Sequence, residues 1–81
     1  MKRKFKISNE GREMISQIET MFDYVGFQDT PYTHDYYFEA RDQFGFTDDE
    51  LIVLEEIIDD IFYGNATYSL VSDYELIVHV S

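Results

Sequence analysis

The sequence contains no cysteine, which excludes disulfide bonds, cysteine-ligated zinc, iron–sulfur centres and thiol catalysis. Tryptophan is also absent, proline occurs once and glycine four times, so no Pro- or Gly-rich linker divides the 81 residues. No apolar run approaches the roughly 20 residues that a membrane-spanning helix needs. The basic start, MKRK, leads into mixed residues and not into the apolar core of a secretory signal. We therefore expect one cytoplasmic domain, residues 1–81, with no membrane contact.

Basic residues are also scarce. Six Lys and Arg stand against seventeen Asp and Glu, which gives a formal net charge of −11. All but one of these carboxylates lie in residues 13–81, where Arg41 is the only Lys or Arg. Such a surface repels DNA, RNA and anionic membranes. We therefore expect no direct nucleic-acid binding, and a partner that is itself a basic protein.

The spacing of apolar residues predicts three helices. The first begins at Ser8 or Asn9, which can cap a helix, and ends at Gly26. The second lies within residues 28–45, with Thr30-Pro31 at its start. The third begins at the capping box Thr47-Asp48-Asp49-Glu50 and ends at residues 64–65. The stripes that define them are Met14, Ile15, Ile18, Met21, Phe22 and Val25; Tyr36, Tyr37, Ala40 and Phe44; and Leu51, Leu54, Ile57, Ile58, Ile61 and Phe62.

Alternation of apolar and polar residues predicts three strands. Residues 3–8 form the first, and residues 67–70 and 74–80 form a hairpin that turns at Ser72-Asp73. We expect the basic first strand to pair with the hairpin, placing Lys4 or Lys6 across from Glu75. The expected fold class is therefore α+β in the order β-α-α-α-β-β, with three helices packed on a small three-stranded antiparallel sheet.

No motif for metal binding or catalysis is present. The two histidines, His34 and His79, are far apart and lack metal-ligand spacing. The run Asp48-Asp49-Glu50 lacks the alternating ligands of a calcium loop. There is no serine elbow, P-loop or dinucleotide-binding turn. We expect no cofactor, no metal and no enzymatic activity, although the sequence leaves open an acid–base pair of carboxylates that converge in space.

The predicted third helix has the most informative surface. Seven carboxylates occur between Asp48 and Asp60 with no Lys or Arg among them. At 1.5 Å per residue this is one charge per ~2.6 Å, between the ~1.7 Å of duplex DNA and the ~3.4 Å of one strand. The pattern favours a nucleic-acid mimic, and a merely solvated acidic face is the competing interpretation. The expected partner-binding residues are Asp48, Asp49, Ile52, Glu55, Glu56, Asp59, Asp60, Tyr36 and Tyr37.

Two resemblances bear on function. The run FKISNEGRE at residues 5–13 resembles the strand-into-helix junction of winged-helix transcriptional regulators, although the helix before the hairpin, which would read DNA, has no Lys or Arg. In size and charge the chain is similar to small acidic phage inhibitors of the anti-CRISPR and anti-restriction type. The leading hypothesis is a non-enzymatic inhibitor of a DNA- or RNA-binding protein. The alternatives are an oligomeric accessory protein, for example a homodimer joined through aromatic surfaces, and a winged-helix-like regulator.

Overall fold

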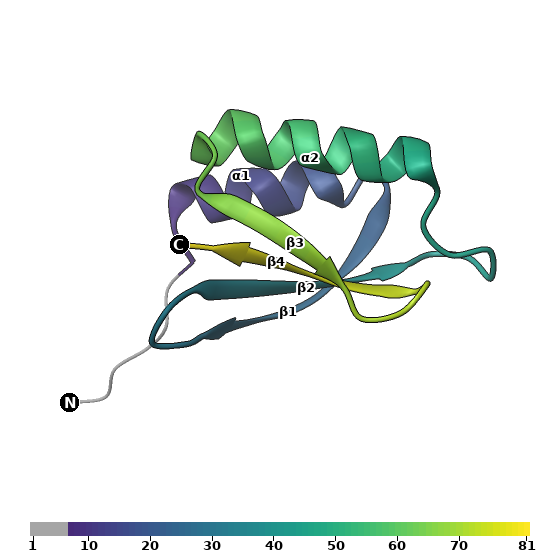
Figure 1. Ribbon diagram of the computed structural model, residues 1–81, viewed down its shortest axis with the longest axis horizontal. Coiled ribbons are helices and arrows are strands. Elements are labelled where there is room, and N and C mark those ends of the chain that lie inside the picture. Colours follow the sequence, from purple (N-terminus) through teal and green to yellow (C-terminus); the bar gives the residue numbers. More distant parts are fainter. Residues whose placement is uncertain (1–6) are drawn as a thin grey trace.

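The computed structural model describes residues 7–81, in which two helices lie on one face of a four-stranded antiparallel sheet (Figure 1). The elements, in chain order, are α1 (Asn9–Ile18), β1 (Phe22–Asp29), β2 (His34–Ala40), α2 (Asp48–Phe62), β3 (Ala66–Leu70) and β4 (Glu75–Val80). The strand order in the sheet is β1-β2-β4-β3. The two helices lie side by side and run in opposite directions, leaving the other face of the sheet uncovered within the described part of the chain (Figure 1).

The expected architecture of three helices on three strands is therefore wrong in its element count, although the α+β class is correct. Both sides of β4 are occupied, by β2 and by β3, and Glu75 lies across from Glu39. The predicted first strand falls largely outside the described residues, as do Lys4 and Lys6, while Ile7 and Ser8 precede α1 without forming a strand. Of the winged-helix resemblance, the helix followed by a terminal hairpin is present as α2, β3 and β4, whereas Ile7 and Ser8 do not form the expected strand before α1.

The first helix ends at Ile18, well before the predicted stop at Gly26. Its start is as expected, because Ser8 Oγ accepts a hydrogen bond from the Gly11 amide at 3.0 Å. Residues 22–29 instead form β1, which carries a β-bulge between Tyr24 and Gly26. The extra residue breaks the two-residue alternation of a strand, so that the apolar spacing resembles the period of a helix.

The predicted second helix is also wrong, because residues 28–45 form the end of β1, a turn, β2 and a loop. The Thr30 amide donates to the Thr33 carbonyl at 2.8 Å, which places Pro31 at the second position of a tight turn. Proline has the same fixed φ at that position as in the first turn of a helix, so Thr30-Pro31 does not distinguish the two. Tyr36 and Tyr37, expected on one helical stripe, are neighbours in a strand and point to opposite faces of the sheet.

The third helix and the final hairpin are confirmed. α2 begins at Thr47, and both hydrogen bonds of the predicted capping box are present. It ends at Tyr63 and Gly64, which both have left-handed backbone angles. In the hairpin, Leu76, Val78 and Val80 are buried under the helices, while the residues between them face the uncovered side.

The core lies between the helices and the covered face of the sheet. Met14 and Ile18 of α1 and Leu54 and Ile58 of α2 pack against it. The remaining members of the core come from the four strands: Phe22, Tyr36, Phe38, Ala66, Leu76, Val78 and Val80. Neither helix of residues 7–81 combines the length and the apolar character that crossing a bilayer would require.

Candidate functional site

Six of the seven carboxylates of α2 are exposed. Glu50 is the exception within the helix, because its side chain accepts from the Thr47 amide at 3.0 Å and is half-buried. Ile52, the apolar residue expected among the carboxylates, is 53% exposed. The exposed acidic residues of α2 are Asp48, Asp49, Glu55, Glu56, Asp59 and Asp60.

These carboxylates occupy both flanks of α2. On one flank, Glu55 and Asp59 border a hollow of about 320 Å³ between α2 and β3. We call this the β3 hollow, and its lining is Glu55, Ile58, Asp59, Gly64, Ala66, Thr67 and Tyr68. On the other flank, Asp60 shares a groove of about 440 Å³ with Glu10 and Glu13 of α1. The eight exposed carboxylates, six from α2 with Glu10 and Glu13, are called the acidic ridge below.

Glu10 and Glu13 were missed by the sequence interpretation. They lie about fifty residues from Asp60 in the chain, and only the antiparallel packing of α1 on α2 brings them beside it (Figure 1). No periodicity within α1 indicates this, because exposed Glu residues are ordinary on a solvated helix face.

No carboxylate of the acidic ridge forms an ion pair within residues 7–81, where Arg12 and Arg41 are the Lys and Arg residues. None of the ion pairs in this part of the chain involves an α2 carboxylate. Arg41 is engaged elsewhere, with Asp23 at 3.0 Å and with the carbonyl groups of Glu19 and Phe22. Asp59 and Asp60 also lie in the last turn of α2, which contains no basic residue and where the helix dipole disfavours negative charge. Among residues 7–81, the ridge carboxylates in the last turn of α2 are therefore electrostatically unfavourable, whereas Asp48 and Asp49 lie in the first turn, where the dipole favours negative charge.

The two tyrosines expected at the binding surface do not join the ridge. Tyr36 is only 2% exposed, and its ring packs against that of Phe27 on the covered face of the sheet. Tyr37 lies on the uncovered face, where its hydroxyl donates to Gln28 Oε1 at 3.3 Å. The tyrosine beside the ridge is Tyr63, which is 88% exposed and lines the same groove as Asp60. Its position follows from the left-handed C-cap of α2.

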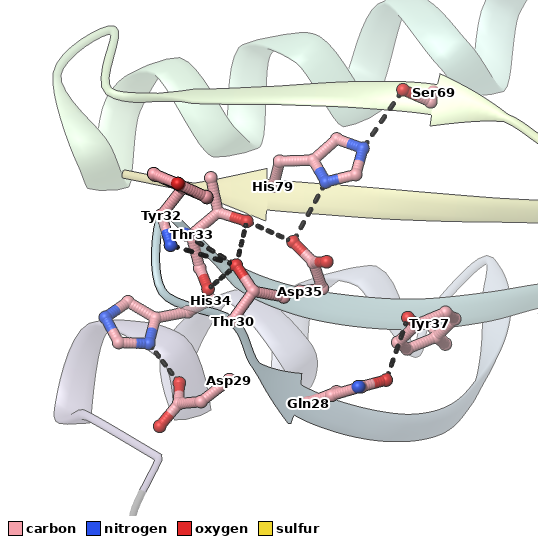
Figure 2. A network of polar contacts seen from close by, with 10 residues as sticks. All are labelled: Gln28, Asp29, Thr30, Tyr32, Thr33, His34, Asp35, Tyr37, Ser69 and His79. Atoms are coloured by element: carbon pink, nitrogen blue, oxygen red, sulfur yellow. Dashed lines mark hydrogen bonds and ion pairs between the residues drawn. The ribbon is translucent and has the colours of Figure 1, made fainter.

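A line of polar contacts crosses three strands on the uncovered face (Figure 2). Ser69 Oγ of β3 lies 3.0 Å from His79 Nε2 of β4, and His79 Nδ1 lies 2.9 Å from Asp35 Oδ1 of β2. The Thr33 hydroxyl donates to the same Asp35 oxygen at 2.7 Å. Burial alone would raise the pKa of the Asp35 carboxyl, but the hydrogen bonds from Thr33 and His79, with the positive charge that His79 can carry, lower it.

The order of atoms along this line is that of nucleophile, base and orienting acid in serine hydrolases. The sequence interpretation missed it because the three residues come from three separate strands and have no motif spacing. The same contacts also have a purely structural effect, since they fix the register of β2, β4 and β3. A second ion pair, between Asp29 and His34, joins the ends of the two strands at the β1–β2 turn (Figure 2).

The uncovered face also has an apolar hollow of about 250 Å³. Val25, Tyr37, Val71 and Ile77 contribute to its lining, and the carboxylates at its rim are those of Glu39 and Glu75. No group of three potential metal ligands occurs among residues 7–81. Residues 7–81 therefore present a ridge of carboxylates without ion pairs on the helical side and a hydrogen-bonded Ser-His-Asp line on the other.

Comparison with known proteins does not add to this description. No protein-family model matches the chain, and neither curated proteins nor solved structures give a significant match.

Proposed function

We propose that this chain is a small acidic binding protein whose acidic ridge occupies the basic, nucleic-acid-binding surface of a partner protein. The observation that carries the proposal is the set of exposed carboxylates on both flanks of α2 with no cation of residues 7–81 paired to them. A partner rich in Lys and Arg would supply the missing charges. The proposal includes a cytoplasmic location, where nucleic-acid-binding proteins act.

Two physical arguments support a binding role over a merely solvated face. Solvated helices ordinarily carry Lys or Arg four residues from Glu or Asp, which stabilises the helix by a few tenths of a kcal/mol per pair. α2 has none, and Asp59 and Asp60 stand at the unfavourable end of its dipole. An arrangement that costs stability in the free protein is expected where a partner compensates for it.

The ridge also offers apolar contact. Ile52 and Val53 are exposed among its carboxylates, and Tyr63 stands at its end. Interfaces commonly place apolar and aromatic residues within a charged rim, where they provide affinity while the charges provide rate and specificity. We therefore expect association that is fast and weakens as salt is added.

The proposal is tested by affinity capture from a nuclease-treated bacterial lysate, followed by mass spectrometry. The wild-type chain is expected to retain a basic nucleic-acid-binding protein that added duplex DNA or RNA displaces. Neutralising the centre of the ridge, with Glu55→Gln, Glu56→Gln, Asp59→Asn and Asp60→Asn together, is expected to abolish the capture.

The control variant makes the same change in net charge away from the ridge. It combines Glu19→Gln, Glu39→Gln, Asp73→Asn and Glu75→Gln, all at exposed positions. This variant is expected to keep the partner. Retention of the partner by the ridge variant, or equal loss in both variants, would contradict a specific role for the ridge.

A second candidate function, hydrolysis of an ester by Ser69, is favoured by one observation, the order Ser69–His79–Asp35 (Figure 2). In this candidate His79 Nε2 would accept the Ser69 proton while Asp35 holds the other ring nitrogen. A fluorophosphonate probe, read by intact mass, tests it directly. A single adduct that Ser69→Ala and His79→Gln both abolish would support hydrolysis, and absence of an adduct on the wild-type chain would remove this candidate.

A further inference from the structure

Within residues 7–81, the edge of the sheet at β3 has backbone groups without a hydrogen-bond partner. The Val71 amide donates to the Glu75 carbonyl and the Ser81 amide to the Asn65 carbonyl, both at 2.9 Å. Because bonding alternates along an antiparallel pair, these two bonds direct the backbone groups of Thr67 and Ser69 toward β4. The N–H and C=O groups of Ala66, Tyr68 and Leu70 therefore point away from β4. Within residues 7–81, no backbone hydrogen bond outside the ladder involves 66–70.

The other edge, β1, has three features that discourage a further strand. It has a bulge at Val25 and charged residues at Asp23 and Asp29, and Arg41 binds across its start. β3 has the sequence ATYSL, without charge, proline or a register shift. Edge strands that do not pair with another chain normally carry charged residues, proline or a bulge. The contrast indicates that β3 is the edge available to another chain.

The β3 hollow lies beside this edge, on the helical side. Ile58 and Tyr68 give it apolar walls, and Glu55 and Asp59 give it two carboxylates on one face of α2. A lysine or arginine fits such a site, because its aliphatic stem packs on apolar surface while its charged end reaches the carboxylates. Its volume of about 320 Å³ can accept one such side chain.

We propose that β3 binds an extended basic segment of the partner as a fifth, antiparallel strand. Residues directly opposite Ala66 and Tyr68 would project to the same face as these two, toward the β3 hollow. A Lys or Arg at one of those positions would bind Glu55 and Asp59, and the backbone would bond to the free groups of 66, 68 and 70. This inference rests on the proposed function and specifies how a basic partner is bound.

A second β3 strand does not fit the same edge. Antiparallel pairing of two β3 strands would bring the Glu55 and Asp59 side chains of both copies beside one another. The sequence has no Lys or Arg after Arg41 to separate them. Like charges at close range disfavour this pair, whereas a segment that carries Lys or Arg is complementary to the β3 hollow.

The test uses a labelled heptapeptide in which lysine alternates with threonine, at low ionic strength. Binding is followed by fluorescence anisotropy, and amide exchange is followed by NMR. We expect the peptide to protect the amides of Ala66, Tyr68 and Leu70, and to leave the already bonded amides of Thr67 and Ser69 unchanged. A peptide of the same charge with N-methylated lysine amides cannot form the ladder, and we expect it to bind at least about tenfold more weakly.

Two variants and their controls locate the site. Glu55→Gln with Asp59→Asn is expected to weaken binding of the lysine–threonine peptide about tenfold, and Glu39→Gln with Glu75→Gln to leave it unchanged. Leu70→Pro removes one outward amide without touching the β4 ladder, and is expected to weaken binding more than Leu70→Ala.

The outcomes separate this inference from the proposed function. Equal binding of the N-methylated peptide, unprotected β3 amides, or a dimer in light scattering would overturn the edge inference. If the lysine–threonine peptide still binds the wild-type chain in those cases and does not bind the ridge variant, the proposed acidic binding function is retained and strand addition at β3 is refuted. Conversely, protection of the β3 amides together with unchanged capture by the ridge variant would refute the ridge proposal and the role given to Glu55 and Asp59, and would leave only the strand pairing at β3.

Discussion

Asp35 is the buried charged residue of the described chain, with 8% of its surface exposed, and it connects three strands through its hydrogen bonds. Because its pKa is lowered in the folded protein, its contribution to stability is complete above the unfolded pKa of ~3.9 and is lost as pH falls through the folded pKa. Asp35 therefore stabilises the folded protein in neutral and mildly acidic solution.

We expect Asp35→Asn to lower the free energy of unfolding by about 1–3 kcal/mol at pH 7, since it removes a charged hydrogen-bond acceptor from a nearly buried site. The difference from wild type should shrink as pH falls below ~4, where the wild-type carboxyl also becomes protonated. Urea denaturation at pH 7 and at pH 3 measures this. Glu39→Gln, exposed on the same strand, is the control, and a difference that does not change with pH would contradict the assignment.

Gly45 is a second position where one residue determines local structure. Its φ is +79°, and a Cβ there would lie 2.5 Å from the Asp73 carbonyl oxygen, which already accepts from the Phe46 amide. We expect Gly45→Ala to destabilise the protein by about 1–3 kcal/mol, since both the backbone angle and the contact are unfavourable. Gly26→Ala, where no atom lies within 4 Å of the added Cβ, should change stability by less than ~0.5 kcal/mol. Thermal denaturation of the two variants checks the difference.

At the scale of the element, the stability of α2 depends on its N-terminal cap, because repulsion among its other carboxylates destabilises the rest of the helix. Thr47 Oγ1 accepts from the Glu50 amide at 3.2 Å, and the Glu50 side chain accepts from the Thr47 amide at 3.0 Å. Thr47→Ala is expected to cost about 1 kcal/mol, and Thr47→Ser less, since serine retains the accepting oxygen. Chemical denaturation followed by circular dichroism measures both. An equal loss in the two variants would mean that the hydroxyl is not what stabilises the start of α2.

The sheet elements show where patterns along the chain mislead. In β1 the residues on the covered face are Phe22, Tyr24 and Phe27. The bulge adds one residue between Tyr24 and Phe27, and the resulting spacing of three also occurs along one face of a helix. In β2, two adjacent tyrosines lie on opposite faces, one buried and one at the rim of an apolar hollow. Aromatic residues are common in strands, so the run of aromatic residues in 34–40 is compatible with β2 once β1 and β4 pair with it.

At the scale of the whole molecule, unbalanced charge lowers stability. With a net charge of −11 and no ridge carboxylate ion-paired within residues 7–81, the folded state is expected to become more stable as salt screens the repulsion. The ridge variant with Glu55, Glu56, Asp59 and Asp60 neutralised should gain a few °C in Tm at low ionic strength, of the order expected for ~1 kcal/mol in a domain of this size. Scanning calorimetry at low and high salt tests this.

The gain should be smaller in high salt, where the repulsion is already screened. A lower Tm for the ridge variant at low salt would show that these carboxylates stabilise the free protein. The ridge would then have no energetic cost in the free protein for a partner to offset.

The sequence by itself determined the features that depend on neighbours along the chain. The capping box at Thr47, the six-residue apolar stripe of α2 and the alternation in β4 each require only local hydrogen bonds or one periodic face, and all three were predicted correctly. The exposure of the α2 carboxylates followed from the same stripe. Local chemistry was sufficient there because nothing distant competes with it.

Only the tertiary structure decided what depends on distant partners. Residues 22–40 became a hairpin because β4 offers them a pairing edge on one side and the two helices offer a cover, neither of which is visible in a local window. The same packing placed Glu10 and Glu13 beside Asp60, removed Tyr36 from the surface and aligned Ser69, His79 and Asp35. Sheet register and helix packing join residues far apart in the chain, and the free energy of those contacts outweighs local preference.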